Sequence, residues 1–143
     1  AIDFDHPQIR HQDCPLVVTR ESFEREISRA RTFGFYHEIE YLKRFGLARG
    51  GSLENAIVID RKRILNAGGL RFADEFVRHK LLDCIGDFSL LGMPILGHIV
   101  VKRSGHAFNH AFLEKFFASK DCWETRTFDV APQTQAQPKS VAL

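Results

Sequence analysis

Hydrophobic residues recur at helical spacing from Asp74 to about Leu90, and this stretch is the longest helix that the sequence predicts. Its apolar face is formed by Val77, Leu81, Cys84, Ile85 and Phe88. Shorter helices are expected at 20–31, 36–45 and 109–118. Thr19 is suited to begin the first of these, and Gly46 is suited to end the second. Short apolar stretches predict strands at 2–4, 16–18, 56–59, 95–102 and 123–128.

Helices and strands alternate in mixed order, which predicts an α+β fold. We expect a two-layer sandwich with helices packed on one face of a mixed sheet. The length of 143 residues suits one domain with a real core. We assign residues 1–128 to this domain and expect the polar, Pro- and Gln-rich tail at 129–143 to be disordered.

The charge balance and cysteine count exclude several classes of protein. Twenty Lys and Arg residues against 18 Asp and Glu leave a net charge of +2, which gives no argument for binding nucleic acid or an anionic membrane. We expect no transmembrane segment, because no run of about 18 apolar residues occurs. Three widely separated cysteines favour a reducing, cytoplasmic location over a disulfide framework. The chain has no initiator Met, and we expect it to be part of a longer protein.

Three polar residues interrupt the longest predicted helix at four-residue intervals. His79, Asp83 and Asp87 share one edge, since such neighbours lie about 40° apart around the axis and about 6 Å along it. The first two could chelate one ion, because imidazole and carboxylate both reach zinc at about 2.0–2.2 Å. This mixed pair is typical of catalytic zinc. Spacing alone still favours a surface pair worth a few tenths of a kcal/mol, because isolated pairs of this kind are common.

Two further motifs add candidate chemistry. SGHAFN, at 104–109, places His106 at a predicted strand-to-helix junction, where rigid elements display functional groups. RARTFGF, at 29–35, places the hydroxyl of Thr32 and two aromatic rings at a helix break. LARGGS, at 47–52, is a Gly-rich turn without the Lys and Ser or Thr of a phosphate-binding loop.

In this order, SRARTFGF, GGSLENAIVID, LRFADEFVRHKLLDCIGD and SGHAFN resemble the C-terminal domain of UDP-3-O-acyl-N-acetylglucosamine deacetylase. That family of zinc enzymes carries out the committed step of lipid A synthesis, and so of lipopolysaccharide synthesis, in Gram-negative bacteria. The resemblance extends from about residue 2 to 128. It implies Zn²⁺ as the cofactor and a UDP-3-O-acyl-glucosamine-type substrate.

The resemblance also implies roles for the residues near the predicted metal site. His79 and Asp83 match the two zinc ligands that this domain supplies. His106 matches the histidine that stabilises the transition state or protonates the leaving amine, and Asp87 matches the carboxylate that orients it. Thr32 matches a hydroxyl near the scissile carbonyl.

Other matched residues belong to substrate binding. Lys80 matches a basic residue of the nucleotide-sugar pocket, and Phe4 matches the aromatic residue that stacks on uracil. The segment 33–58 matches a small β-α-β-like insert that forms a passage for the acyl chain. Its expected lining consists of Phe33, Phe35, Ile39, Ala48, Ser52, Leu53, Ala56 and Val58. Each of these could equally belong to an ordinary core.

One part of the family pattern is missing. The family's N-terminal domain supplies a third zinc ligand, a histidine, and an adjacent glutamate that acts as general base. No histidine here has that setting; the candidates that fail are His6, His11, His37, His98 and His110. The resemblance therefore implies half of an interfacial site, completed by the absent N-terminal domain. The alternatives are a non-catalytic module that binds an acyl chain or nucleotide sugar, and a structural domain, which explains His106 and Asp87 poorly.

Overall fold

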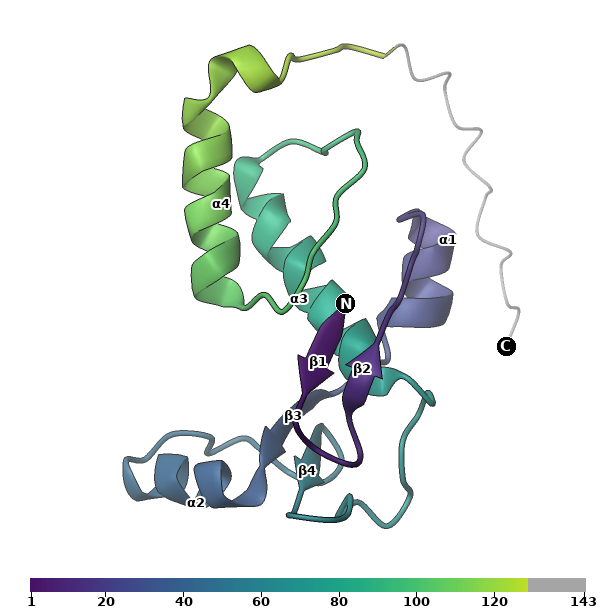
Figure 1. The fold of residues 1–143 in the computed structure, drawn as a ribbon, viewed down its shortest axis with the longest axis vertical. Helices are drawn as coiled ribbons and strands as arrows, with labels where there is room; N and C mark the ends of the chain where they lie inside the picture. Colours follow the sequence, from purple (N-terminus) through teal and green to yellow (C-terminus); the bar gives the residue numbers. More distant parts are fainter. Residues whose placement is uncertain (129–143) are drawn as a thin grey trace, which may run out of the picture.

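A long helix lies at the centre of residues 1–128, the part of the chain that the computed structural model describes (Figure 1). Two short strands, β1 (Ile2–Phe4) and β2 (Arg10–Gln12), pair antiparallel, and β3 (Thr32–Phe35) and β4 (Ala56–Ile59) pair parallel. The helices are α1 (Arg20–Ser22), α2 (Tyr36–Arg44), α3 (Glu75–Phe88) and α4 (His106–Ala118). The predicted α+β class is confirmed, with the sheet divided into two separate pairs.

The core joins both strand pairs to the beginning of α3. Its buried members are Ile2, Ile9, Ile57, Ile59, Phe76 and Val77. Burial of each such side chain contributes about 1.5–3 kcal/mol. The second half of α3 instead packs against α4, which lies alongside it in Figure 1. The long helix therefore carries a hydrophobic anchor at one end and presents its other end to α4. No helix within residues 1–128 is long and apolar enough to cross a membrane.

The predicted β-α-β unit is present in the structure. Strand β3 leads into α2, and the chain returns in β4 parallel to β3, with Phe33 opposite Ile57. Gly46 ends α2 as expected, because its φ of 71° belongs to the left-handed region that glycine adopts readily. The N–H groups of Gly46 and Leu47 donate to the carbonyls of Lys43 and Leu42, which completes a Schellman cap.

A buried ion pair connects the start of β3 to the start of α3. The Glu75 side chain is fully buried and that of Arg31 is 8% exposed, with Arg31 Nε 2.9 Å from Glu75 Oε1. The backbone N–H of Arg31 donates to the same oxygen at 3.0 Å. Burial raises the pKa of Glu75, but hydrogen bonds from Arg31 and from the Arg71 backbone outweigh it, so the pKa lies below its usual value. The carboxylate is therefore charged.

This ion pair also explains why the first predicted helix, 20–31, is too long. Thr19 caps α1 as expected, but α1 passes into a π-helical turn, Phe23–Ile27, and the helix ends there. The chain then leaves the helical path, so that the backbone and side chain of Arg31 both reach Glu75. A continued helix would direct the Arg31 N–H along its own axis.

Three predicted strands are wrong. Residues 16–18, 95–102 and 123–128 form no strand. The end of the second of these is held near β1, where Ala1 N donates to the Val101 carbonyl. Just after it, Arg103 N donates to the Ala1 carbonyl, and the Arg103 side chain pairs with Asp3. A β-strand needs a neighbour along its length, and Leu96 is accordingly 87% exposed. The expected disorder at 129–143 lies outside the described residues.

Replacing Glu75 should test the buried ion pair. Glu75→Gln keeps the shape but leaves Arg31 as an uncompensated buried charge, and the expected loss in free energy of unfolding is about 3–5 kcal/mol. Urea unfolding measures this loss. The matched control is Glu24→Gln, which removes an exposed pair with Arg20 and should cost less than about 1 kcal/mol. Equal losses in the two variants would contradict a structural role for the buried pair.

The same pair predicts an acid-dependent stability. Because folding lowers the pKa of Glu75, the carboxylate stabilises the protein above its unfolded-state pKa, and this contribution is lost as pH falls through the folded-state pKa. The stability difference between wild type and Glu75→Gln should therefore shrink toward acid pH. A difference that stays constant from neutral to strongly acid pH would argue against this titration.

Candidate functional site

His79 and Asp83 lie together on one edge of α3, as their spacing predicts. Nε2 of His79 is 3.4 Å from Oδ1 of Asp83, and the side chains are 14% and 13% exposed. This distance is long for a hydrogen bond. Two tetrahedral ligands each about 2.1 Å from zinc would lie about 3.4 Å from one another. The pair is therefore spaced for a shared cation.

The protonation state of His79 suits a metal ligand. Burial lowers the pKa of this imidazole, and the Asp83 carboxylate, which acts in the opposite direction, does not cancel the effect. The ring is therefore neutral at physiological pH, the form that binds metal. Its Nδ1 is buried and makes no hydrogen bond of standard geometry with any described residue. The backbone of Ala30 is close enough to act on the pKa, so it could orient the ring from behind.

The donor set fits zinc, but only in part. Within residues 1–128 no three His, Cys, Asp or Glu side chains gather in a way that could hold a metal ion. Catalytic zinc sites usually have three protein ligands. The imidazole nitrogen and carboxylate oxygen of this pair are suitable ligands, and a complete site of this type needs at least one more.

One turn beyond Asp83, Asp87 receives hydrogen bonds from α4. His106 Nδ1 lies 3.0 and 2.9 Å from the two carboxylate oxygens. Burial alone raises the pKa of Asp87, but hydrogen bonds from Asn109 and His106 outweigh it and hold the pKa below its usual value. Asp87 is thus a charged acceptor that fixes Nδ1 as the protonated nitrogen. The imidazole of His106, 63% exposed, can then present Nε2 to a substrate.

The sequence analysis missed two partners of Asp87. Asn109 Nδ2 donates to Oδ2 at 2.8 Å, and His110 Nε2 lies 3.4 Å from Oδ1. Both follow His106 on α4, at three and four residues, and therefore share its face. The helical spacing of His106, Asn109 and His110 could have shown that the three share a face of α4. It could not show that this face meets Asp87, because that depends on the packing of α4 against α3.

Lys80 contacts this edge of α3, and Thr32 begins the strand that carries Phe33. The Lys80 ammonium is 3.1 Å from Asp83 Oδ2, and it lies 6.0 Å from the centre of the Phe33 ring. Asp83 is therefore already shared between an imidazole and an ammonium. Thr32 is the first residue of β3, directly after Arg31, and its side chain is exposed. The buried ion pair thus sets the position of Thr32.

The aromatic residues proposed for substrate binding form part of the core. Phe33 makes edge-on contacts with Phe4, Phe76 and His79, at centroid distances of 5.7, 5.1 and 6.2 Å. Phe35 also packs against Phe4. Phe4 in addition lines a shallow polar hollow that includes Arg10 and Arg103. Phe33 therefore buttresses the His79 ring.

The expected lining of the acyl passage is divided between two faces of the β3–β4 pair. Phe33 and Phe35 pack against the core. Ala56 and Val58 are opposite Thr32 and Gly34 in the register and so face the other side, where Ile39 from α2 packs closely over Gly34. Three further lining candidates, Ala48, Ser52 and Leu53, lie in the exposed connection between α2 and β4.

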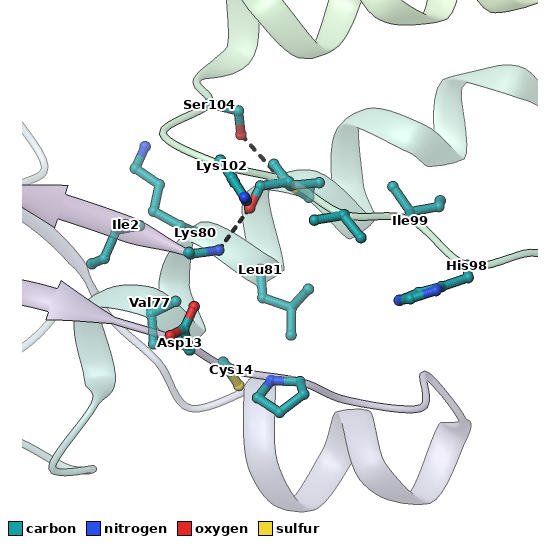
Figure 2. A pocket seen from close by; sticks show the side chains of 15 residues that line it. Ile2, Asp13, Cys14, Val77, Lys80, Leu81, His98, Ile99, Lys102 and Ser104 are labelled. Carbon is teal, nitrogen blue, oxygen red and sulfur yellow. Dashed lines mark hydrogen bonds between the residues drawn. The ribbon is translucent and has the colours of Figure 1, made fainter.

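A cavity lies on the neighbouring face of α3, and neither His79 nor Asp83 is among the residues that line it. Its volume is about 360 Å³, and Figure 2 shows Val77, Lys80 and Leu81 of α3 in its wall, opposite Ile99 and Ser104. Lys80 is the residue that reaches both the cavity and the Asp83 carboxylate.

Comparisons with known proteins show the family to which the chain belongs. The LpxC family model, described as UDP-3-O-acyl N-acetylglycosamine deacetylase, matches residues 1–118. Proteins called UDP-3-O-acyl-N-acetylglucosamine deacetylase are similar to the chain. The one from Myxococcus xanthus (strain DK1622) is 57% identical over 124 residues, 87% of this chain and 40% of the relative. That from Syntrophotalea carbinolica is 55% identical over 123 residues, 86% of this chain and 40% of the relative.

A third relative, from Saccharophagus degradans, is 51% identical over 143 residues, 96% of this chain and 47% of the relative. The chain belongs to the UDP-3-O-acyl N-acetylglycosamine deacetylase family. It spans less than half the length of these curated relatives.

The spacing of His79 and Asp83 predicts a measurable affinity for zinc. Calorimetric titration of the chain with Zn²⁺ should show weak binding at one site, and His79→Ala and Asp83→Ala should each lower the affinity by about tenfold or more, because each removes a ligand. His11→Ala is the matched control, since His11 also pairs with an Asp but is exposed and distant in sequence. An affinity unchanged in both α3 variants would exclude this pair as ligands.

Proposed function

We propose that this chain is the C-terminal half of a zinc-dependent deacetylase. The enzyme hydrolyses the N-acetyl group of UDP-3-O-acyl-N-acetylglucosamine in lipid A biosynthesis, in the cytoplasm. Family membership and the names of the relatives support the reaction class. The observation that carries the proposal is the His79–Asp83 pair, with the hydrogen-bonded Asp87 and His106 one turn further along the same edge.

Two residues of α3 are the proposed zinc ligands. His79 and Asp83 hold Zn²⁺, which when bound polarises the acetyl carbonyl and makes water a nucleophile at neutral pH. His79 is kept neutral by burial and supported by Phe33, so it is ready to bind without first losing a proton. Thr32, exposed at the start of β3, is proposed to contact the oxygen of the scissile carbonyl, where a donor stabilises developing negative charge.

Residues of α4 supply the proton for the leaving amine. Hydrolysis of an amide needs a proton donor because an amine leaves poorly as an anion. His106 donates from Nε2, since Asp87 holds Nδ1. Despite burial, hydrogen bonds keep the pKa of Asp87 below its usual value, so its carboxylate stays charged and accepts from His106 Nδ1.

Substrate binding is assigned to the groups around this edge. Lys80 is proposed to offset the charge of the diphosphate, and Phe4 to stack on the uracil. The acyl chain is proposed to run along the β3–α2–β4 unit, where Ile39, Ala56 and Val58 offer apolar surface. Phe33 and Phe35 would support that passage from the core side.

The chain alone should be almost inactive. Two ligands hold zinc weakly, and residues 1–128 place no Glu beside the His79–Asp83 pair as a general base. In the enzyme we assign the third ligand and the base to the remaining half of the protein, its partner across the site.

An activity assay tests this function. The full-length protein should release acetate from UDP-3-O-acyl-N-acetylglucosamine, lose activity when zinc is chelated and regain it on addition of Zn²⁺. The 143-residue chain should be slower by at least about a thousandfold, because it lacks the base. Binding of substrate without turnover by the full-length protein would favour a non-catalytic module, and full turnover by the short chain would disprove the division of the site.

Replacing Lys80 tests the substrate assignment. In the full-length enzyme, Lys80→Ala should raise KM by about tenfold and change kcat less, because a charge contact to the nucleotide acts on ground state and transition state alike. Steady-state kinetics measure both. Lys43→Ala, an exposed lysine at the end of α2, is the control and should leave both constants near wild type. An unchanged KM for Lys80→Ala would contradict the assignment.

A further inference from the structure

We propose that Asn109 is a positioning residue that holds the Asp87 carboxylate against His106. This inference deepens the proposed deacetylase function and rests on it. Asn109 is 2% exposed and lies in the first turn of α4. Its amide donates to Asp87 Oδ2 at 2.8 Å and also lies 3.6 Å from the Cys84 sulfur.

The contacts of the carboxylate show why an additional donor matters. His106 Nδ1 is almost equally distant from both oxygens of Asp87, at 3.0 and 2.9 Å. His106 therefore does not by itself fix the rotation of the carboxylate. A second imidazole, His110, lies 3.4 Å from Oδ1. Two imidazoles on one helix thus compete for one acceptor.

Asn109 resolves this competition from the buried side. Its amide always donates and carries no titratable proton, so it occupies Oδ2 at every pH. Asn109 lies in the same turn of α4 as His106, three residues later. Because both side chains bind the Asp87 carboxylate, the helix fixes the position of the carboxylate relative to the imidazole. Among the groups that lower the pKa of Asp87, Asn109 acts ahead of both histidines. The Asn109 amide therefore stabilises the charged Asp87 carboxylate, which accepts the hydrogen bond from His106 Nδ1.

The placement of Asn109 also separates it from direct catalysis. It is buried beneath Asp87 and Cys84, whereas His106 is mostly exposed. Asn109 cannot touch a substrate that reaches His106 from outside. Asn109 must therefore act on turnover through Asp87, so replacing Asn109 should lower kcat only in a protein that still has Asp87.

A double-mutant cycle in the full-length enzyme tests this dependence. Asn109→Ala should lower kcat by about tenfold to a hundredfold, the usual effect of removing a partner behind a functional group, with KM changed by less than about threefold. In an Asp87→Ala background the same change should cost nothing more. Losses that multiply in the two backgrounds would overturn the proposal, because they would mean that Asn109 acts independently.

Two variants separate positioning from stability. Asn109→Asp keeps the shape but replaces the donor with an acceptor, so it should slow turnover at least as much as Asn109→Ala. Leu113→Ala, one turn further on the same helix and also buried, should lower the melting temperature, because it leaves a cavity, and leave kcat near wild type. If Leu113→Ala slowed turnover as much as the Asn109 variants, a general loss of packing would explain the effect and the proposal would fail.

A second readout does not depend on turnover or zinc. Nitrogen-15 NMR of the histidine rings distinguishes protonation at Nδ1 from protonation at Nε2. Wild-type His106 should show Nδ1 protonation, and Asn109→Ala should show a mixture. An unchanged His106 tautomer would overturn the inference. If the wild-type enzyme itself released no acetate, the deacetylase function would fail instead, and the tautomer measurement would still decide the contact.

Discussion

The buried pair of Arg31 and Glu75 is the contact on which the arrangement of this domain depends. It ends the first helix, begins β3 one residue later and fixes the first turn of α3. Both polar groups are removed from water, so each requires the other. From this pair, β3 carries Thr32 and Phe33, and α3 carries His79 one turn further on, so that the Phe33 and His79 rings meet. The candidate site is thus attached to a buried ion pair that is costly to disrupt.

The site itself is built along one edge of α3 by residues spaced four apart. His79 and Asp83 share a position suited to a cation, while Asp87 receives its hydrogen bonds from α4. One helix therefore sets the distance between the His79–Asp83 pair and the Asp87 carboxylate that holds His106. The chemistry is coupled to packing, because the contact between α3 and α4 decides where His106 points. The buried Asn109 extends this support behind Asp87.

Much of this could be predicted from the sequence, and the failures have a common cause. The long helix, the Thr19 and Gly46 caps and the β4 strand follow from local spacing and turn chemistry. The stretch 95–102 has the composition of a strand but no neighbour along most of its length, so it stays irregular. The first helix stops early because a residue 44 positions away captures the Arg31 N–H. His110 follows His106 by four residues in the sequence, but only the packing of α4 on α3 brings it beside Asp87.

The sequence by itself determined which side chains share an edge of α3, because four-residue spacing and the helical repeat leave no other outcome. It also carried the four motifs by which the family can be recognised. Only the tertiary structure decided that His106, Asn109 and His110 meet Asp87, and that Phe33 supports His79 and packs into the core. These contacts join residues about 20 to 50 positions apart. They depend on how α4 and β3 pack on α3, which no local pattern of residues specifies.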